Sequence, residues 1–223
     1  TQPLKITYTG EIPMERGFGS SATVALGTTK ALNQFFNLNL TEKEIMAVTN
    51  HAEMINHGKA SGLDAATVNS DYLVFFNKEM GPKMLKAKLG ATLLIMDTGQ
   101  LGNTKEAVTQ VRSLLDKSEA AKNNMKRLGE LADLTKQAWL KQDSLTVGKI
   151  FNEAQEILHS FNISTAKIDQ LQKLALSNGA FGFKLSVGGL GGINITLCKN
   201  QEIANEIAAK CQDIISNSWI EEI

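Results

Sequence analysis

The chain has 223 residues, 43% of them hydrophobic, and its 23 basic and 23 acidic residues cancel to a formal net charge of zero. This composition predicts a folded globular protein, and the interspersed charges argue against the basic surface that binds nucleic acid or an anionic membrane. No apolar run reaches the ~20 residues that span a bilayer, and the start "TQPLK" lacks the pattern of a secretory signal, so we expect a cytoplasmic location.

The first part of the chain alternates between strand and helix patterns. Residues 5–10, "KITYTG", alternate like a strand, and residues 22–36 carry apolar side chains at helical spacing after a glycine-rich loop. A second helix is predicted over residues 41–55, which open on the capping-box sequence "TEKE". Residues 67–76, "TVNSDYLVFF", are predicted to form another strand.

The second part predicts a sheet with helices on one face. Residues 91–97, "ATLLIMD", form an expected strand, and residues 104–178 an expected series of amphipathic helices. Two strands joined by "VGGLGG", a helix and a last strand follow, at residues 181–186, 193–198, 201–216 and 218–223. The order β-α-β-β-α-β is that of a split βαβ (ferredoxin-like) unit.

These patterns together predict an α+β fold class with two domains. We place the boundary near residue 88, with a domain of residues 1–88 that contains the glycine-rich loop and a second domain of residues 89–223. Cys198 and Cys211 have no second cysteine at ligand spacing, so we expect small buried apolar side chains rather than a disulfide or zinc site.

The stretch "PMERGFGSSATVALGTTKAL", residues 13–32, has the glycines of a phosphate-binding loop. It is not a Walker A loop, because Gly19 is followed by Ser20 rather than lysine. Gly17, Gly19 and Ala22 match the dinucleotide pattern, but no strand ending in an acidic residue follows about 20 residues later. Two interpretations remain: an anion-binding loop at a helix N-terminus, or a flexible turn with a serine cap.

Four stretches in one order, "IPMERGFGSSA", "HAEMINHGKASGLDAAT", "DTGQLGNTKEAV" and "KLSVGGLGG", make the chain resemble the GHMP kinase superfamily. Within it, the chain is most similar to the bacterial mevalonate kinase family. The resemblance covers essentially all residues and implies a two-lobed kinase that transfers the γ-phosphoryl group of ATP to the 5-hydroxyl of mevalonate. Two alternatives stay open: a kinase for phosphomevalonate or another small alcohol, and a non-catalytic nucleotide-binding or assembly protein.

The resemblance also implies the roles of individual residues. The loop that would wrap the ATP phosphates comprises Glu15, Arg16, Gly17, Phe18, Gly19, Ser20 and Ser21. Ser21 and Glu53 would ligate Mg²⁺, and Asp64, eleven residues after Glu53, would be the catalytic aspartate. The residue types suit these roles, because Mg²⁺ prefers oxygen ligands and a carboxylate can orient a hydroxyl and accept its proton.

Superfamily members begin with a strand and loop of the type K-x-x-L-x-G-E-H that carries a catalytic lysine, and this pattern does not occur in the sequence. The N-terminal lobe is therefore expected to be incomplete and the activity of this chain impaired. An uncovered edge in that lobe would favour association with a second copy, as a homodimer, or with a separate N-terminal piece. His51 and His57, six residues apart, do not share a helix face and are expected to be structural.

Overall fold

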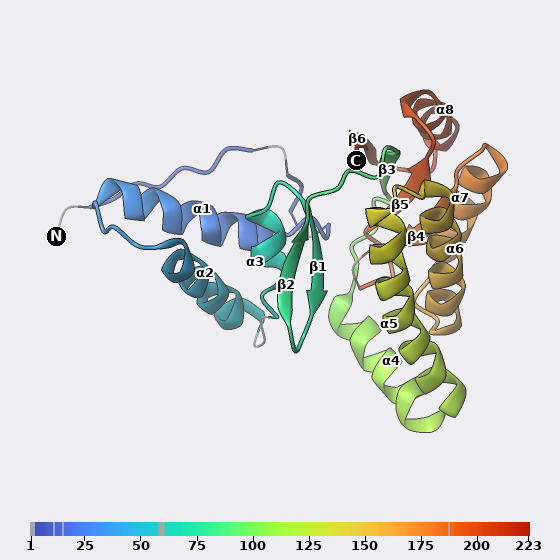
Figure 1. Ribbon diagram of the computed structural model, residues 1–223, viewed down its shortest axis with the longest axis horizontal. Coiled ribbons are helices and arrows are strands. Elements are labelled where there is room, and N and C mark those ends of the chain that lie inside the picture. Colours follow the sequence, from blue (N-terminus) through green and yellow to red (C-terminus); the bar gives the residue numbers. More distant parts are fainter. Residues whose placement is uncertain (1–2, 11, 15, 58–60, 187) are drawn as a thin grey trace. The chain divides into compact units, whose positions relative to one another are not determined.

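The computed structural model describes residues 3–10, 12–14, 16–57, 61–186 and 188–223 (Figure 1). The chain divides into two compact units. The N-terminal unit comprises Thr1–Met14 with Phe18–Lys86, and the C-terminal unit Glu15–Gly17 with Ala87–Ile223. The division after Lys86 separates two compact bodies, and the functional domains 1–88 and 89–223 remain a prediction.

Three helices make up most of the N-terminal unit: α1 (Ser20–Phe35), α2 (Glu42–His57) and α3 (Leu63–Val68). The two helices expected here are confirmed as α1 and α2, and α3 was not anticipated. The capping box of α2 is formed, because the Thr41 N–H donates to Glu44 Oε2 over 2.8 Å and the Glu44 N–H donates to Thr41 Oγ1 over 3.3 Å. These hydrogen bonds hold the pKa of Glu44 below its usual value.

The N-terminal unit also contains a β-hairpin, β1 (Leu73–Asn77) paired antiparallel with β2 (Gly81–Leu85). The strand predicted over residues 67–76 is wrong in its first half. Residues 67–68 end α3, and Ser70 Oγ then accepts from the Tyr72 N–H in a tight turn, so pairing begins only at Leu73. Residues 5–10 were also expected to be a strand, but they form none in the described structure, which provides no partner strand for them.

The C-terminal unit is built on the predicted four-stranded antiparallel sheet, in the order β4-β5-β3-β6. Its strands are β3 (Thr92–Asp97), β4 (Gly182–Leu185), β5 (Ile193–Cys198) and β6 (Asn217–Glu222). Central β3 pairs with β5 and β6 along its whole length. The split βαβ order expected from the sequence is therefore confirmed.

Five helices accompany this sheet: α4 (Thr104–Lys117), α5 (Glu119–Leu140), α6 (Ser144–Ser160), α7 (Ala166–Ser177) and α8 (Gln201–Cys211). Each follows a polar residue whose side chain accepts a hydrogen bond from the N–H three positions on, as a local N-cap does. These caps are Asn103, Ser118, Asp143, Thr165 and Asn200. Helix α8 was expected to reach residue 216, but it ends at Cys211, where a turn leads the chain into β6.

The core of the C-terminal unit lies between the sheet and the helices, with buried side chains from α5, α6, α7 and α8. Its fully buried side chains include Leu94, Met96, Leu171, Phe183 and Ile207. Cys198 and Cys211 belong to this core as free thiols, as the sequence predicted, and burial raises the pKa of Cys198 to about 11. Among the described helices, none has the length and apolar character needed to cross a membrane.

The approach of α6 to β4 depends on two glycines. A Cβ on Gly182 would lie 2.1 Å from the Gly148 carbonyl oxygen, so the backbones touch where no side chain fits. Further along, Asn152 Oδ1 accepts from the Phe183 N–H and Gln155 Oε1 from the Leu185 N–H, over 2.9 and 2.7 Å. Helix α6 therefore satisfies the outer edge of β4, which would otherwise present unpaired donors.

Candidate functional site

The glycine-rich loop enters α1 through a left-handed residue. Gly19 caps the helix at φ 67° and ψ 28°, and a Cβ at this position would lie 3.3 Å from Val68 Cγ2 of α3. Both the dihedral angles and the close approach favour glycine. The first turn of α1 has no acidic side chain, and Gly19 provides no side-chain cap. The positive end of the helix dipole therefore meets no carboxylate from its own first turn, which suits an anionic ligand.

A partly buried oxygen pair connects α1 to α2. Ser21 Oγ, in the first turn of α1, donates to Glu53 Oε1 over 2.6 Å. The Glu53 side chain belongs to a buried stripe of α2, at four-residue spacing from Ile45 and Thr49, and the residue is only 5% exposed. The structure thus brings together the two residues predicted to hold Mg²⁺, which are 32 positions apart in the sequence. A carboxylate and a hydroxyl are oxygen ligands of the kind that Mg²⁺ takes.

Asp64 stands in the first turn of α3, in the same unit as the oxygen pair. It is exposed, and among the described residues it makes no hydrogen bond or ion pair that would occupy its carboxylate. The chain reaches it through Gly62, which is left-handed at φ 83°. Helix α3 packs against both α1 and α2. The structure does not bring the Asp64 side chain into contact with Ser21 or Glu53, so its predicted catalytic role rests on this placement and on the resemblance.

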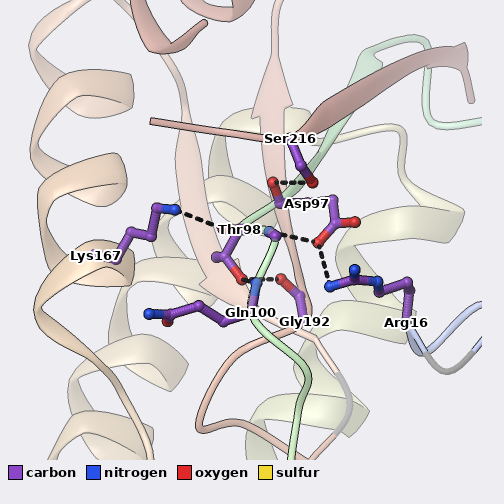
Figure 2. Close-up of polar contacts among 8 residues, drawn as sticks. Arg16, Asp97, Thr98, Gln100, Lys167, Gly192 and Ser216 are labelled. Carbon is purple, nitrogen blue, oxygen red and sulfur yellow. Dashed lines mark hydrogen bonds and ion pairs between the residues drawn. The ribbon is translucent and has the colours of Figure 1, made fainter. Parts of the chain in front are cut away.

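The beginning of the predicted phosphate loop belongs to the C-terminal unit. Arg16 Nη1 lies 3.5 Å from Asp97 Oδ1 (Figure 2). Asp97 ends β3, is 4% exposed and also accepts from the Gly99 N–H over 2.8 Å. A nearly buried carboxylate requires such partners, and the guanidinium supplies the opposite charge. Glu15, the first residue of the predicted loop, lies outside the described residues.

Hydrogen bonds connect the segment after β3 to a second glycine-rich loop, residues 188–192 between β4 and β5 (Figure 2). The Thr98 N–H and Oγ1 both donate to the Gly192 carbonyl, over 3.0 and 2.8 Å, and the Gly192 N–H donates to the Gln100 carbonyl over 2.8 Å. Lys167 Nζ of α7 donates to the Thr98 carbonyl over 2.6 Å. These bonds fix the backbone around Asp97, and therefore the position at which Arg16 can be held.

The second loop needs glycine because other backbone segments approach it closely. A Cβ on Gly188 would lie 2.8 Å from Thr104 Cα, and one on Gly191 would lie 2.9 Å from the Leu101 carbonyl oxygen. The loop and the first phosphate-loop residues surround a pocket of about 40 Å³, lined by Arg16, Gly17, Gly102, Thr104, Ser186, Gly188, Gly189, Gly191 and Gly192. A guanidinium, hydroxyls and exposed backbone around so small a space suit a compact anionic group.

No cluster of three or more histidine, cysteine, aspartate or glutamate side chains capable of holding a metal occurs in the part of the chain that the structure describes. Ser21 and Glu53 together offer two protein oxygens to a metal. This is the usual situation of Mg²⁺ in phosphoryl-transfer sites, where protein oxygens supply one or two ligands.

The sequence did not single out Asp97 or Lys167. Asp97 had a signal that could have been used, since it ends an apolar strand and begins the stretch "DTGQLGNTKEAV". Lys167 had none, because its lysine stands in an ordinary amphipathic helix and meets the Thr98 carbonyl only through the packing of α7.

Comparison with family models gives two matches. Residues 2–70 match the model described as "GHMP kinases N terminal domain", and residues 117–216 match "GHMP kinases C terminal". The chain is also 31% identical to a mevalonate kinase of Aeropyrum pernix over 203 residues. That match covers 90% of this chain and 63% of the relative, so the chain spans less than two thirds of the relative's length.

Solved structures give matching folds. A mevalonate kinase from methicillin-resistant Staphylococcus aureus is 31% identical, with a TM-score of 0.75 over 95% of this chain and 68% of that one. A mevalonate kinase from L. major, solved with R-mevalonate, has a TM-score of 0.81 over 92% of this chain and 65% of that one. At 22% identity the second match bears on the fold alone.

Proposed function

Since the chain belongs to the GHMP kinase family, we propose that it contributes to an ATP-dependent kinase that phosphorylates the 5-hydroxyl of mevalonate, with Mg²⁺ as the metal. The observation that carries this proposal is the Ser21–Glu53 hydrogen bond at the beginning of α1. It brings a hydroxyl and a carboxylate together next to a helix N-terminus suited to phosphate. The similarity to mevalonate kinases supports the choice of alcohol.

In this proposal the N-terminal residues of α1 bind the phosphates of ATP. Gly19 lets the backbone turn closely around an anion, and the helix dipole stabilises the negative charge. Ser21 and Glu53 would hold Mg²⁺, which when bound neutralises charge on the phosphate oxygens. Arg16, held by Asp97, keeps a positive charge at the start of the loop.

Asp64 is assigned to the acceptor alcohol. Its exposed carboxylate orients the 5-hydroxyl toward the γ-phosphorus and accepts the hydroxyl proton as the new O–P bond forms and the bond to ADP breaks. Its position in the first turn of α3 fixes the backbone from which this carboxylate extends.

A substrate panel tests the proposal. The protein would be assayed for ADP formation from ATP and Mg²⁺ with mevalonate, phosphomevalonate, galactose or homoserine as acceptor. We expect turnover with mevalonate, and about a tenfold or larger loss at limiting Mg²⁺ for Glu53→Gln, since the metal would lose a charged ligand. Turnover with phosphomevalonate instead would favour a sibling kinase, and nucleotide binding without turnover a non-catalytic role.

Other parts of the functional picture remain predictions. These are the cytoplasmic location, the homodimer or association through the N-terminal lobe, and the dependence of activity on a lysine-bearing segment. The substrate panel addresses the last of them, because turnover by the 223-residue chain itself would mean that no such segment is needed.

A further inference from the structure

The first turn of α7 contains a lysine whose positive charge does not stabilise the helix. Lys167 is the second residue of α7, and a cation at this end meets the positive end of the helix dipole. The acidic residue of the same turn, Asp169, has other partners, because its Oδ1 accepts from Ser164 Oγ over 2.6 Å and lies 3.3 Å from His159 Nδ1. The position of Lys167 therefore requires an explanation outside α7.

The Lys167 amine provides a hydrogen bond to a buried carbonyl. Its Nζ donates to the Thr98 carbonyl oxygen over 2.6 Å (Figure 2). Thr98 has no exposed surface and follows Asp97, the last residue of β3 that pairs in the sheet. Among the described residues, no other donor to this carbonyl is found. Because a buried carbonyl without a donor costs folding free energy, loss of the amine would oblige the segment after β3 to shift.

The same segment also holds Arg16. In Figure 2, Lys167 approaches the segment from one side and Arg16 from the other. Asp97 Oδ1 accepts from the Gly99 N–H over 2.8 Å and lies 3.5 Å from Arg16 Nη1. Since Asp97 and Thr98 are consecutive, a shift of the Thr98 carbonyl would displace the carboxylate that holds the guanidinium. All of these contacts lie within the C-terminal unit.

We propose that Lys167 is a positioning residue for the phosphate loop: its hydrogen bond to Thr98 fixes the Asp97 carboxylate and, through it, the Arg16 guanidinium that meets the nucleotide phosphates. The inference rests on the proposed function and adds a residue to it. Lys167 does not line the pocket of about 40 Å³ that Arg16 borders. Its effect on a bound nucleotide must therefore pass through Arg16, and should disappear when Arg16 is replaced.

A double-mutant cycle with Arg16→Met separates this role from two others. If Lys167 acts through Arg16, Lys167→Met weakens nucleotide binding only while Arg16 is present. If the ammonium group attracts the nucleotide by its charge alone, the loss of affinity is the same with and without Arg16. If Lys167 only stabilises the fold, the melting temperature falls and the affinity of the folded protein does not change.

The experiment measures the dissociation constant of a non-hydrolysable ATP analogue by isothermal titration calorimetry, well below the Tm of every variant. Arg16→Met should weaken binding about tenfold or more, since a charged hydrogen bond is lost. Lys167→Met should weaken it about three- to tenfold, but change it less than about twofold in the Arg16→Met background. Lys167→Arg, which keeps a charged donor, should retain most of the affinity.

Lys173→Met is the matched control for the lost charge. Lys173 lies on the same helix, is exposed and makes no hydrogen bond or ion pair among the described residues. Its replacement should leave the dissociation constant unchanged. A loss of affinity equal to that of Lys167→Met would mean that the charge of α7, rather than the contact with Thr98, affects the nucleotide.

Other outcomes also overturn the inference. Unchanged affinity in Lys167→Met, an equal loss in both Arg16 backgrounds, or a loss that Lys167→Arg shares would each refute the role of Lys167. If Arg16→Met still weakens binding in these cases, the phosphate-loop assignment stands. If Arg16→Met binds the analogue normally, or if the unaltered protein does not bind it, that assignment in the proposed function is wrong and the role of Lys167 fails with it.

Discussion

The two units of the chain differ in what they bury. The C-terminal unit closes a four-stranded sheet with capped helices, and its core contains side chains as large as Phe161 and Phe183. The N-terminal unit buries mainly small or isolated apolar residues and leaves large ones exposed, among them Tyr8, Phe35 and Ile55. Yet the candidate oxygen pair and Asp64 belong to the N-terminal unit. The larger buried core therefore lies in the C-terminal unit and the candidate oxygen pair and Asp64 in the N-terminal unit. Substitutions in the C-terminal core should lower stability, and substitutions of the candidate residues should lower activity.

The largest effect is expected from Asp64→Asn. The amide cannot accept the proton of the acceptor hydroxyl, so turnover of mevalonate by the full-length protein should fall about 10²- to 10⁴-fold, the usual contribution of a general base. Because Asp64 is exposed and makes no hydrogen bond among the described residues, the urea midpoint should not change. Steady-state kinetics and urea denaturation check both parts. Turnover like that of the unaltered protein would remove Asp64 from its proposed role.

Gly182→Ala, in contrast to Asp64→Asn, should lower the free energy of unfolding strongly. The new Cβ would lie 2.1 Å from the Gly148 carbonyl oxygen, so α6 and β4 must separate, at an expected cost of about 3 kcal/mol in the free energy of unfolding. Gly129→Ala is the matched control, because Gly129 lies within α5 with nothing near its Cβ position. Alanine there should stabilise the protein by about 0.5–1 kcal/mol. Equal effects at the two glycines would contradict the close packing.

A smaller effect is expected at the beginning of α2. Thr41→Ala removes the hydroxyl that accepts from the Glu44 N–H, and should lower the free energy of unfolding by about 1 kcal/mol. Helix α2 carries Glu53, so nucleotide binding in the presence of Mg²⁺ should weaken only as far as the helix frays. Circular dichroism melting and nucleotide titration separate these effects. A loss of binding without a loss of stability would mean that Thr41 acts on the site directly.

The smallest effect is expected in how the free energy of unfolding depends on pH, through Lys184. Desolvation lowers the pKa of Lys184 to about 8, while burial raises the pKa of Cys198 to about 11. Above about pH 8 the folded protein releases the lysine proton that the unfolded chain still binds, so this lysine makes stability rise with pH. Above about pH 9 the unfolded thiol ionises while the folded one does not, so Cys198 makes stability fall.

Lys184→Met should therefore flatten the rise in stability between about pH 8 and 9, where the lysine acts before the thiol. Urea midpoints measured at intervals across that range, for the variant and the unaltered protein, test this. Identical slopes would mean that the lysine stays charged in the folded protein. Below about pH 8 the variant should be the more stable, because it no longer buries a charge.

Much of the fold could be predicted because its signals are local. The capping box at Thr41 and Glu44 and the apolar periodicity of α1 act within a few residues, so they are visible in the sequence and reappear as hydrogen bonds. The split βαβ order also followed, because its central strands β3 and β5 are short apolar runs. For the candidate site, the sequence supplied Ser21, Glu53 and Asp64 through a resemblance between motifs.

Tertiary structure decided what depends on distant partners. Residues 5–10 have the alternation of a strand but pair with no strand in the described part of the chain. Strand β2 has a weak pattern, with Gly81 and Pro82, yet it pairs with β1. The contact of Arg16 with Asp97 spans 81 positions. The burial of Asn50 Oδ1 likewise arises only once Gly62 packs on α2. The sequence by itself determined the helices other than α3, the split βαβ order and the candidate residues. Strand pairing and burial depend on contacts between segments that are far apart in the sequence, so only the folded chain determines them.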